Sequence, residues 1–105
     1  MNELDHTEGI LVSLRRIIRA IAIHSRQLAT KHHLTVPQLL VLREIQRESD
    51  VPMGRLAAMV NLSRPTLSSI VDRLVRRELV ARIRDGHDRR IVRARLTGAG
   101  EEILA

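Results

Sequence analysis

The segment from Ser63 to Ser69 combines short hydroxyl side chains with an arginine. Its sequence is SRPTLSS, and Arg73 and Arg76 follow it along the chain. Hydroxyl and guanidinium groups form hydrogen bonds with base edges and phosphates, and the major groove of duplex DNA, about 12 Å wide, admits a helix whose first turns carry little bulk. These residue types therefore favour contact with a nucleic acid, and a well-capped surface helix is the alternative.

Positive charge is concentrated in one third of the chain. The net charge is +6, and the segment from Arg64 to Arg95 holds ten arginines against four acidic residues, which accounts for the whole excess. Such a cluster is typical of a protein that binds a polyanion. A solvated arginine-rich surface is the alternative interpretation of the charge alone.

Local signals place these side chains on a helix-turn-helix. Ser63 is suited to cap a helix over residues 64–78. Successive residues of a helix are 100° apart, and this spacing places on the inward side of the helix Leu67, Ile70, Val71 and Leu74. Its outward side holds Pro65, Ser69, Asp72, Arg73 and Arg76, flanked by Thr66 and Ser68. A shorter helix over residues 53–60 precedes it, and Asn61 is suited to the left-handed residue of the turn.

Two alternating runs after this helix predict a β-hairpin over residues 80–84 and 91–96. Apolar and arginine side chains alternate in both runs, and Asp85 and Gly86 begin the polar loop between them. The tip of the hairpin carries His87, Asp88, Arg89 and Arg90. An arginine at such a tip can enter the minor groove, where negative potential is concentrated. Phosphates repel a free carboxylate, so we expect Asp88 to orient one of its neighbours instead.

The amino-terminal third predicts a long amphipathic helix from about Glu8 to Lys31. One apolar stripe consists of Ile10, Leu14, Ile17, Ile21 and Leu28. A second stripe lies beside it, so the apolar side is wider than packing against one small domain requires. We therefore expect part of this helix to contact another chain. Thr35 is suited to cap a further helix that runs to about Glu48.

Length and composition indicate one domain. The chain has 105 residues, of which 44% are hydrophobic, and it has no cysteine, so disulfides and thiolate metal sites are excluded. The amino end is acidic and no run of about 18 apolar residues occurs, so we expect a soluble, cytoplasmic protein without a membrane span. The chain has no aromatic residue, which removes the stacking that most single-strand binders use and leaves duplex binding.

The residue pattern predicts neither catalysis nor a cofactor or metal site. No serine, threonine or carboxylate stands beside a histidine and an orienting acid in a recognisable pattern, and no glycine-rich phosphate loop is present. His32 and His33 are adjacent in sequence, so their side chains point to different sides of a helix and do not form an i, i+4 metal pair. We expect a protein that is not an enzyme.

The chain resembles the MarR (multiple antibiotic resistance regulator) family of winged-helix transcription factors in two segments, LTVPQLLVL and LAAMVNLSRPTLSSIVDRLVRRELVARIRDGHDRRIVRARLTGAG. The resemblance covers residues 34–104 and rests on the order of the S-R-P-T, D-R-L, D-x-R and L-T-x-x-G motifs. It implies that residues 64–78 form a recognition helix and that Arg90 enters the minor groove. With the residue pattern, it gives as expected DNA contacts Ser63, Arg64, Pro65, Thr66, Ser68, Ser69, Arg73, Arg76, Arg84, Arg89 and Arg90.

The resemblance also implies a homodimer and, often, a small-molecule effector bound between the dimerisation helices and the DNA-binding lobe. We expect the dimer contact at Ile10, Leu14, Ile17, Ile21 and Leu28. We expect such an effector near Arg15, Arg16 or His33. The chain departs from the family pattern in two places: its final helix has hardly begun at GAGEEILA, and Glu78 replaces a glycine. A shortened chain, an unordered end and dimerisation through residues 10–29 are the open explanations of the first departure.

Together these features predict a mainly α winged helix-turn-helix fold with a small antiparallel β-hairpin. Residues 1–33 are expected to form a dimerisation helix, residues 34–97 a DNA-binding domain, and residues 98–105 the start of a truncated C-terminal dimerisation helix. The predicted function is regulation of transcription, with repression favoured, by a homodimer on a pseudo-palindromic duplex operator. A winged helix that contacts protein instead of DNA is the alternative, although arginines and small hydroxyls favour DNA.

Overall fold

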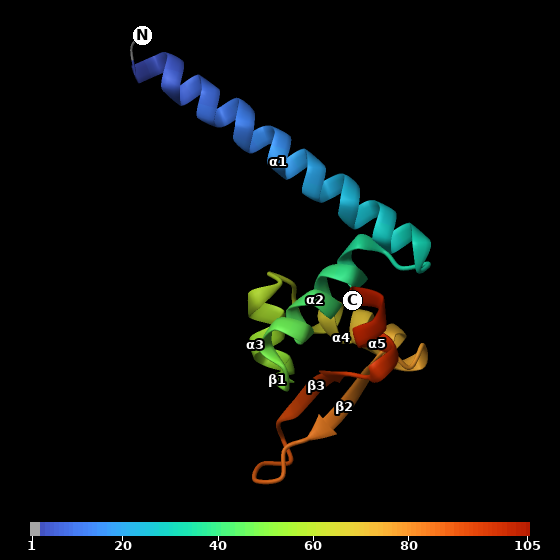
Figure 1. Cartoon of the computed structure of the whole chain (residues 1–105). Helices are drawn as coiled ribbons and strands as arrows, with labels where there is room; N and C mark the ends of the chain where they lie inside the picture. The colour runs from blue at the N-terminus through green and yellow to red at the C-terminus, as the bar shows by residue number, and fades with distance from the viewer. Residues whose placement is uncertain (1–2) are drawn as a thin grey trace. The chain divides into compact units, whose positions relative to one another are not determined.

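The computed structural model describes residues 3–105 and confirms a mainly helical winged-helix fold (Figure 1). The elements in chain order are α1 (Glu3–Lys31), α2 (Val36–Glu48), β1 (Val51–Pro52), α3 (Met53–Met59), α4 (Arg64–Arg76), β2 (Val80–Arg84), β3 (Val92–Leu96) and α5 (Gly98–Leu104). The chain divides into two compact units, and the boundary between them follows Leu34. We call the second unit, Thr35–Ala105, the lobe.

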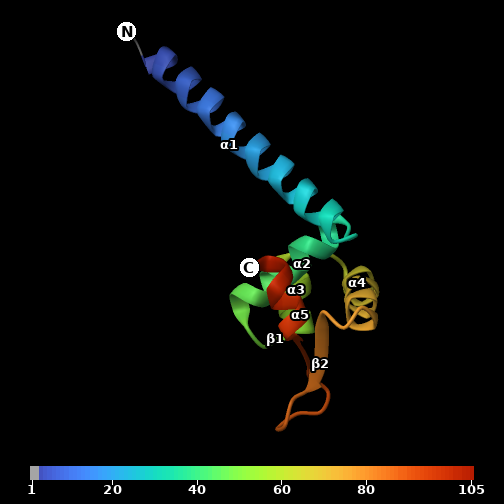
Figure 2. The same cartoon turned by 45° about the vertical axis from the view of Figure 1, so that its right-hand side comes forward.

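The lobe combines helices α2 to α5 with a three-stranded antiparallel sheet in the order β1-β3-β2. Strand β3 pairs with β1 at Val51 and Ala94, and its pairing with β2 runs from Val80 opposite Leu96 to the loop. Figures 1 and 2 show β2 and β3 extending away from the helices of the lobe, with their connecting loop at the far end. The predicted hairpin is therefore confirmed, and β1 adds a short third strand to it.

Aliphatic side chains from α2, α3, α4 and β1 form the centre of the core. The largest fully buried side chains are Leu39, Leu42, Ile45, Leu56, Leu67, Leu74, Val41, Val51 and Val71. Three of them, Leu67, Val71 and Leu74, belong to α4, as their helical spacing predicts, and Ile70 is half-buried. Because one side of α4 is fixed in the core, the opposite side is left exposed in a defined orientation.

Side-chain caps determine where α2 and α4 begin. The Thr35 hydroxyl accepts a hydrogen bond from the backbone N–H of Gln38, and the Gln38 side chain accepts one from the backbone N–H of Thr35. This reciprocal pair is a capping box. Ser63 caps α4, and Asn61 has a left-handed backbone with φ 55°. The caps and the left-handed residue predicted from the sequence are confirmed.

Two predicted boundaries are wrong by more than one residue. Helix α1 begins at Glu3 instead of about Glu8. Asp5, an acidic residue near this start, favours the extension because a carboxylate interacts with the positive end of the helix dipole. Helix α4 ends at Arg76, before the predicted end at residue 78. Glu78 has a φ of 61°, in the left-handed region, and therefore cannot continue the helix.

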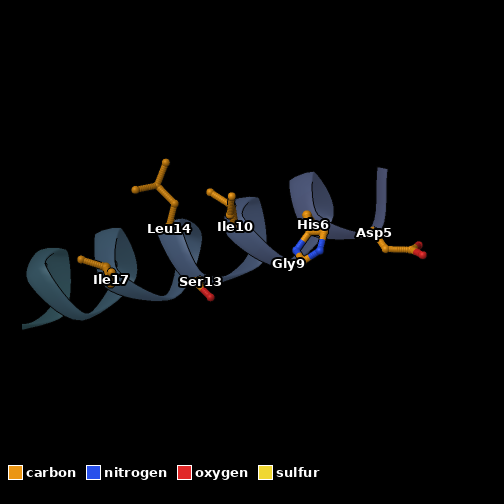
Figure 3. A pocket seen from close by; sticks show the side chains of 7 residues that line it. All are labelled: Asp5, His6, Gly9, Ile10, Ser13, Leu14 and Ile17. Carbon is orange, nitrogen blue, oxygen red and sulfur yellow. The ribbon is translucent and has the colours of Figure 1, made fainter. Parts of the chain in front are cut away.

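Helix α1 carries a side of exposed aliphatic residues. Ile10 is 66% exposed, and Leu14, Ile17 and Ile21 are also exposed, whereas Leu28 is half-buried. Figure 3 shows Ile10 and Leu14 on the same side of the helix. The shallow hollow in this view is formed by α1 alone, between Asp5 and Ile17. Exposed aliphatic surface of this extent indicates an interaction site.

Gly100 lies against the backbone that follows α4. A Cβ added to Gly100 would lie 2.2 Å from the carbonyl oxygen of Leu79. The same carbonyl accepts a hydrogen bond from the backbone N–H of Thr97 at 3.1 Å. The Thr97 hydroxyl in turn donates to the carbonyl oxygen of Glu78 at 2.6 Å. The L-T-x-x-G motif therefore joins the start of α5 to the turn between α4 and β2.

Replacing Gly100 with alanine is expected to lower the free energy of unfolding by about 1 to 3 kcal/mol, because backbone must move to admit the new methyl group. Gly98→Ala is the matched control, since it lies in the same helix and a Cβ there meets nothing within 4 Å. Urea unfolding of the two variants measures the difference. Equal stability of the two variants would contradict the close contact at Leu79.

Candidate nucleic-acid interface

The first turn of α4 is held by a pair of hydroxyl groups. Ser63 Oγ accepts a hydrogen bond from the backbone N–H of Thr66 at 3.3 Å and donates one to Thr66 Oγ1 at 2.9 Å. The hydroxyl of Ser63 is therefore used within the cap. The predicted contact residues that α4 leaves exposed are Arg64, Pro65, Thr66, Ser69, Arg73 and Arg76.

Ser69 and Arg73 lie one turn apart on the exposed side of α4. Together with Pro65 and Thr66 they line a hollow whose other wall is the start of α2. The full lining is Thr35, Pro37, Gln38, Pro65, Thr66, Ser69, Ile70 and Arg73. None of these residues is acidic, and Arg73 is the charged residue among them, so the lining of this hollow has a net positive charge. Small hydroxyls beside one cation form a surface that can donate and accept hydrogen bonds.

The interpretation of Asp72 as part of the outward side needs correction, because Asp72 and Ser68 face β2. Arg82 on β2 forms an ion pair with Asp72. The same guanidinium donates to the carbonyl oxygen of Ser68 at 3.2 Å and to its Oγ at 3.4 Å. The helical period gave the angular position of residues 68 and 72, but not the strand that packs beside them. A DNA contact by Ser68 stays a prediction.

Asp85 organises the loop at the end of the hairpin. Its Oδ1 accepts hydrogen bonds from the backbone N–H groups of His87 at 2.7 Å and of Asp88 at 3.3 Å. Its Oδ2 accepts from Arg93 Nε at 3.1 Å and Nη2 at 3.0 Å. These hydrogen bonds, foremost the one from the His87 backbone, hold the pKa of Asp85 below its ordinary value of 3.8. One carboxylate thus ties the start of the loop to β3.

Asp88 holds Arg90, in agreement with the prediction that it orients a neighbour. Its carboxylate accepts hydrogen bonds from Arg90 Nε and Nη2, both at 3.1 Å, and from the Arg90 backbone N–H at 3.0 Å. The Arg90 side-chain bonds, followed by its backbone bond, lower the pKa of Asp88. The side chain of Arg90 is nevertheless 91% exposed. Arg84 supports the same loop by donating to the carbonyl oxygen of Arg89 at 2.9 Å.

Ion pairs divide the arginines of the lobe into two groups. On the sheet, Arg93 pairs with Asp85 and Arg95 pairs with Asp50, so these cations are already compensated. Within the part of the chain that the structure describes, the arginines of the 64–95 cluster without an ion pair include Arg64, Arg73, Arg76 and Arg89, together with Arg84 at the end of β2 beside the loop. Uncompensated positive charge therefore remains along α4 and at the tip of the hairpin.

The sequence of the chain matches a known family and several known proteins. Residues 32–91 match the MarR family. The chain belongs to the MarR family. It is 34% identical over 101 residues to YsmB of Bacillus subtilis, an uncharacterized HTH-type transcriptional regulator, and the match covers 96% of this chain and 69% of that protein. It is 27% identical to the repressor MdtR of the same organism, with 91% and 64% coverage.

Solved structures share the fold of this MarR-family chain. A MarR family protein from Bacillus stearothermophilus is 36% identical, with a TM-score of 0.82 and coverage of 99% of this chain and 71% of that chain. The MepR–DNA complex of S. aureus is 21% identical, with a TM-score of 0.74 and coverage of 89% and 77%; it supports the fold. The chain spans about two thirds of the length of these curated relatives. The named relatives are regulators of transcription and not enzymes.

The candidate effector residues lie on or next to α1. Arg15 and Arg16 are adjacent and exposed, and His33 follows the helix with a left-handed φ of 56°. They line neither the hollow on α1 nor the hollow between α2 and α4. Among the described residues, no group of three or more potential metal ligands occurs. None of the helices described here has the length and apolar character needed to cross a membrane.

Two residues of the interface carry roles that the sequence did not reveal. Asp85 was predicted only as a turn residue, although an Asx side chain at the start of a loop is a known signal for hydrogen bonds to the following backbone. Arg82 was predicted only as one of the arginines that alternate with apolar residues along the hairpin. Its contact with Asp72 spans ten residues and two elements, so no local pattern in this MarR-family chain could have indicated it.

Asp85→Asn is expected to destabilise the lobe near neutral pH, because asparagine loses the ion pair with Arg93. A depressed pKa contributes stability above the ordinary value of 3.8, and this contribution disappears as the pH falls through the lower folded value. The stability difference between the unmodified chain and the variant should therefore shrink below about pH 4. Thermal unfolding across the acid range measures this difference.

Glu102→Gln provides the control. Glu102 is exposed on α5, and its substitution replaces one carboxylate by an amide, as Asp85→Asn does. We expect the control to unfold at nearly the same temperature as the unmodified chain near neutral pH. A difference for Asp85→Asn that stays constant down to the lowest pH would show that its carboxylate charge is not what stabilises the loop.

Proposed function

We propose that this chain is a transcriptional regulator that binds double-stranded DNA in a sequence-specific manner through α4 and the hairpin. The observation that carries the proposal is the distribution of uncompensated arginines, which lie along α4 and at the hairpin tip, while Arg82, Arg93 and Arg95 of the sheet are paired. The DNA complex of the structural relative MepR supports it. The repressor name of MdtR supports repression as the direction of regulation.

In this proposal α4 enters the major groove with its exposed side. Ser69 and Arg73 lie in the middle of that side and are the candidates for contact with base edges, for which arginine prefers guanine. Arg76 and Arg64 lie nearer the ends and suit phosphates. The exposed start of α4, with Pro65 and Thr66, is slender enough to approach the floor of the groove.

The hairpin loop reaches the adjacent minor groove. Asp88 occupies Nε and Nη2 of Arg90, which leaves Nη1 as a donor for an acceptor in the groove. Because Asp88 also binds the Arg90 backbone, the guanidinium starts from a restricted position. Asp88 therefore reduces the freedom that Arg90 would lose on binding, and Arg89 beside it remains available for a phosphate.

The exposed aliphatic side of α1 supports the proposal that the protein acts as a homodimer. Two copies related by a two-fold axis would place two α4 helices in successive major grooves, about 34 to 36 Å apart, on a pseudo-palindromic operator. The proposal places this regulator in the cytoplasm, together with its DNA. A small-molecule effector near Arg15, Arg16 or His33 completes the proposal.

The direct test of DNA recognition is selection of bound genomic fragments, followed by affinity measurements on variants. Arg73→Ala and Ser69→Ala are expected to change which bases are preferred, with each good base contact worth about 1 to 3 kcal/mol. Arg90→Ala should weaken binding to all duplexes and reduce its salt dependence, because it removes a cation and leaves Asp88 uncompensated. Fluorescence anisotropy at several salt concentrations measures both effects.

Arg47→Ala is the matched control for charge. It removes one arginine from α2, where Arg47 pairs with Glu44, and leaves α4 and the hairpin intact. We expect binding close to that of the unmodified chain. If the control weakened binding as much as Arg73→Ala and Arg90→Ala did, charge alone would explain the affinity and the assigned roles would be wrong. A chain that binds no duplex would support a protein partner instead.

Dimerisation is tested on α1. Ile17→Asp combined with Ile21→Asp places two carboxylates on the exposed aliphatic side of α1. A dimer contact would bury these charges, and the free energy lost by removing them from water exceeds what the contact contributes. The double variant should therefore sediment as a monomer. Ile23→Asp changes an exposed isoleucine on a different side of the same helix and is expected to leave the oligomer intact. An unchanged sedimentation coefficient for the double variant would remove this side of α1 from the dimer contact.

A further inference from the structure

Arg64 and Arg90 line one hollow, although they come from α4 and from the hairpin loop. The other residues of its lining are Pro52, Met53, Gly54, Ile91 and Val92. None of the lining residues is acidic. Arg64 has no ion pair within the described residues, so the hollow carries positive charge that its own walls do not compensate.

Gly54 determines where the side chain of Arg64 can lie. A Cβ added to Gly54 would lie 2.8 Å from Nη1 and 3.8 Å from Cζ of Arg64. The guanidinium therefore rests on the first turn of α3, at the one position of that turn that has no side chain. Any larger residue must displace it. The displaced atoms belong to the end of a flexible, exposed side chain, so the displacement is expected to cost little stability, in contrast to the backbone contact of Gly100.

The two hollows beside α4 separate Arg64 from the other candidate contacts. Thr66, Ser69 and Arg73 line the hollow shared with α2, whereas Arg64 lines the hollow shared with α3 and the hairpin loop. A side chain between a helix in the major groove and a loop in the minor groove lies beside the sugar-phosphate backbone that separates the grooves. A planar guanidinium is well suited to bind a phosphate there.

We propose that Gly54 is a positioning residue for duplex binding: by lacking a side chain, it keeps the Arg64 guanidinium beside the hairpin loop, where Arg64 binds a phosphate of the DNA backbone. The inference rests on the proposed function, which assigns Arg64 to a phosphate, and adds to it the residue that makes this contact geometrically accessible. It assigns Gly54 no contact with DNA of its own.

The test is a double-mutant cycle on Gly54 and Arg64, with a mixed-sequence duplex of about 30 base pairs as the probe. Arg64→Ala should weaken binding about tenfold, the scale of one charged hydrogen bond, and lower the salt slope by about 0.9. Gly54→Ala should weaken it about threefold with no loss in Tm. In the Arg64→Ala background, Gly54→Ala should have no further effect. Neither variant should change the order of preference among selected operators.

Gly98→Ala is the control, because it adds the same methyl group where nothing lies within 4 Å; it should bind like the unmodified chain. Unchanged affinity of Gly54→Ala would overturn the inference, and so would a Gly54→Ala effect that persists without Arg64. A changed base preference in Arg64→Ala would overturn the phosphate assignment. If the unmodified chain bound no duplex, the proposed function itself would be wrong. If the unmodified chain bound the duplex and Gly54→Ala bound it equally well, only the inference about Gly54 would be wrong, so the two failures are distinguishable.

Discussion

The contact between Arg82 and α4 sets the geometry on which the rest of the site depends. Arg82 pairs with Asp72 and donates to the carbonyl oxygen and hydroxyl of Ser68, so one guanidinium on β2 reaches three acceptors on α4. Arg82 is 32% exposed and Asp72 is 42% exposed, and ion pairs of this kind contribute at most about 1 kcal/mol to stability. The value of the contact is therefore orientation: it fixes the hairpin relative to the helix beside it.

The turn between α4 and β2 is restrained from its other side by the start of α5. Glu78 adopts the left-handed backbone that ends α4, and its carbonyl oxygen accepts the hydroxyl hydrogen of Thr97. The absence of a side chain at Gly100 lets α5 approach the next carbonyl, that of Leu79. Together with the Arg82 contact, these interactions leave little room for the hairpin to rotate about the turn. A pre-set distance between two contact elements lowers the entropy cost of binding both grooves at once.

The fold was predictable where the signal is local. Caps at Thr35 and Ser63, the left-handed Asn61 and the alternation of the hairpin each involve residues within a few positions of one another, and each was found as predicted. The pairing of β1 with β3 and the ion pair of Asp50 with Arg95 were not predicted, because their partners lie more than 40 residues apart. The helical period located Asp72 by angle, yet could not identify β2 as its neighbour.

The composition of the candidate site was predictable from the sequence, whereas the role of each arginine in it was predictable only in part. A cluster of arginines indicated a polyanion partner, but the sequence could not distinguish Arg93 and Arg95, which are compensated on the sheet, from Arg73 and Arg89. That distinction requires the acidic partners to be placed in space. Likewise, the aliphatic side of α1 followed from periodicity, whereas its extent of exposure follows from the structure.

The central claim is that α4 and the hairpin loop form one rigid surface that meets a duplex at two places simultaneously. Titration of the ¹⁵N-labelled chain with a mixed-sequence duplex, followed by backbone amide shifts, tests it most directly. The account predicts that amides of residues 66–69 and of residues 86–90 shift together, with one midpoint, as DNA is added. Shifts confined to either segment, or shifts in α1 without both, would contradict it.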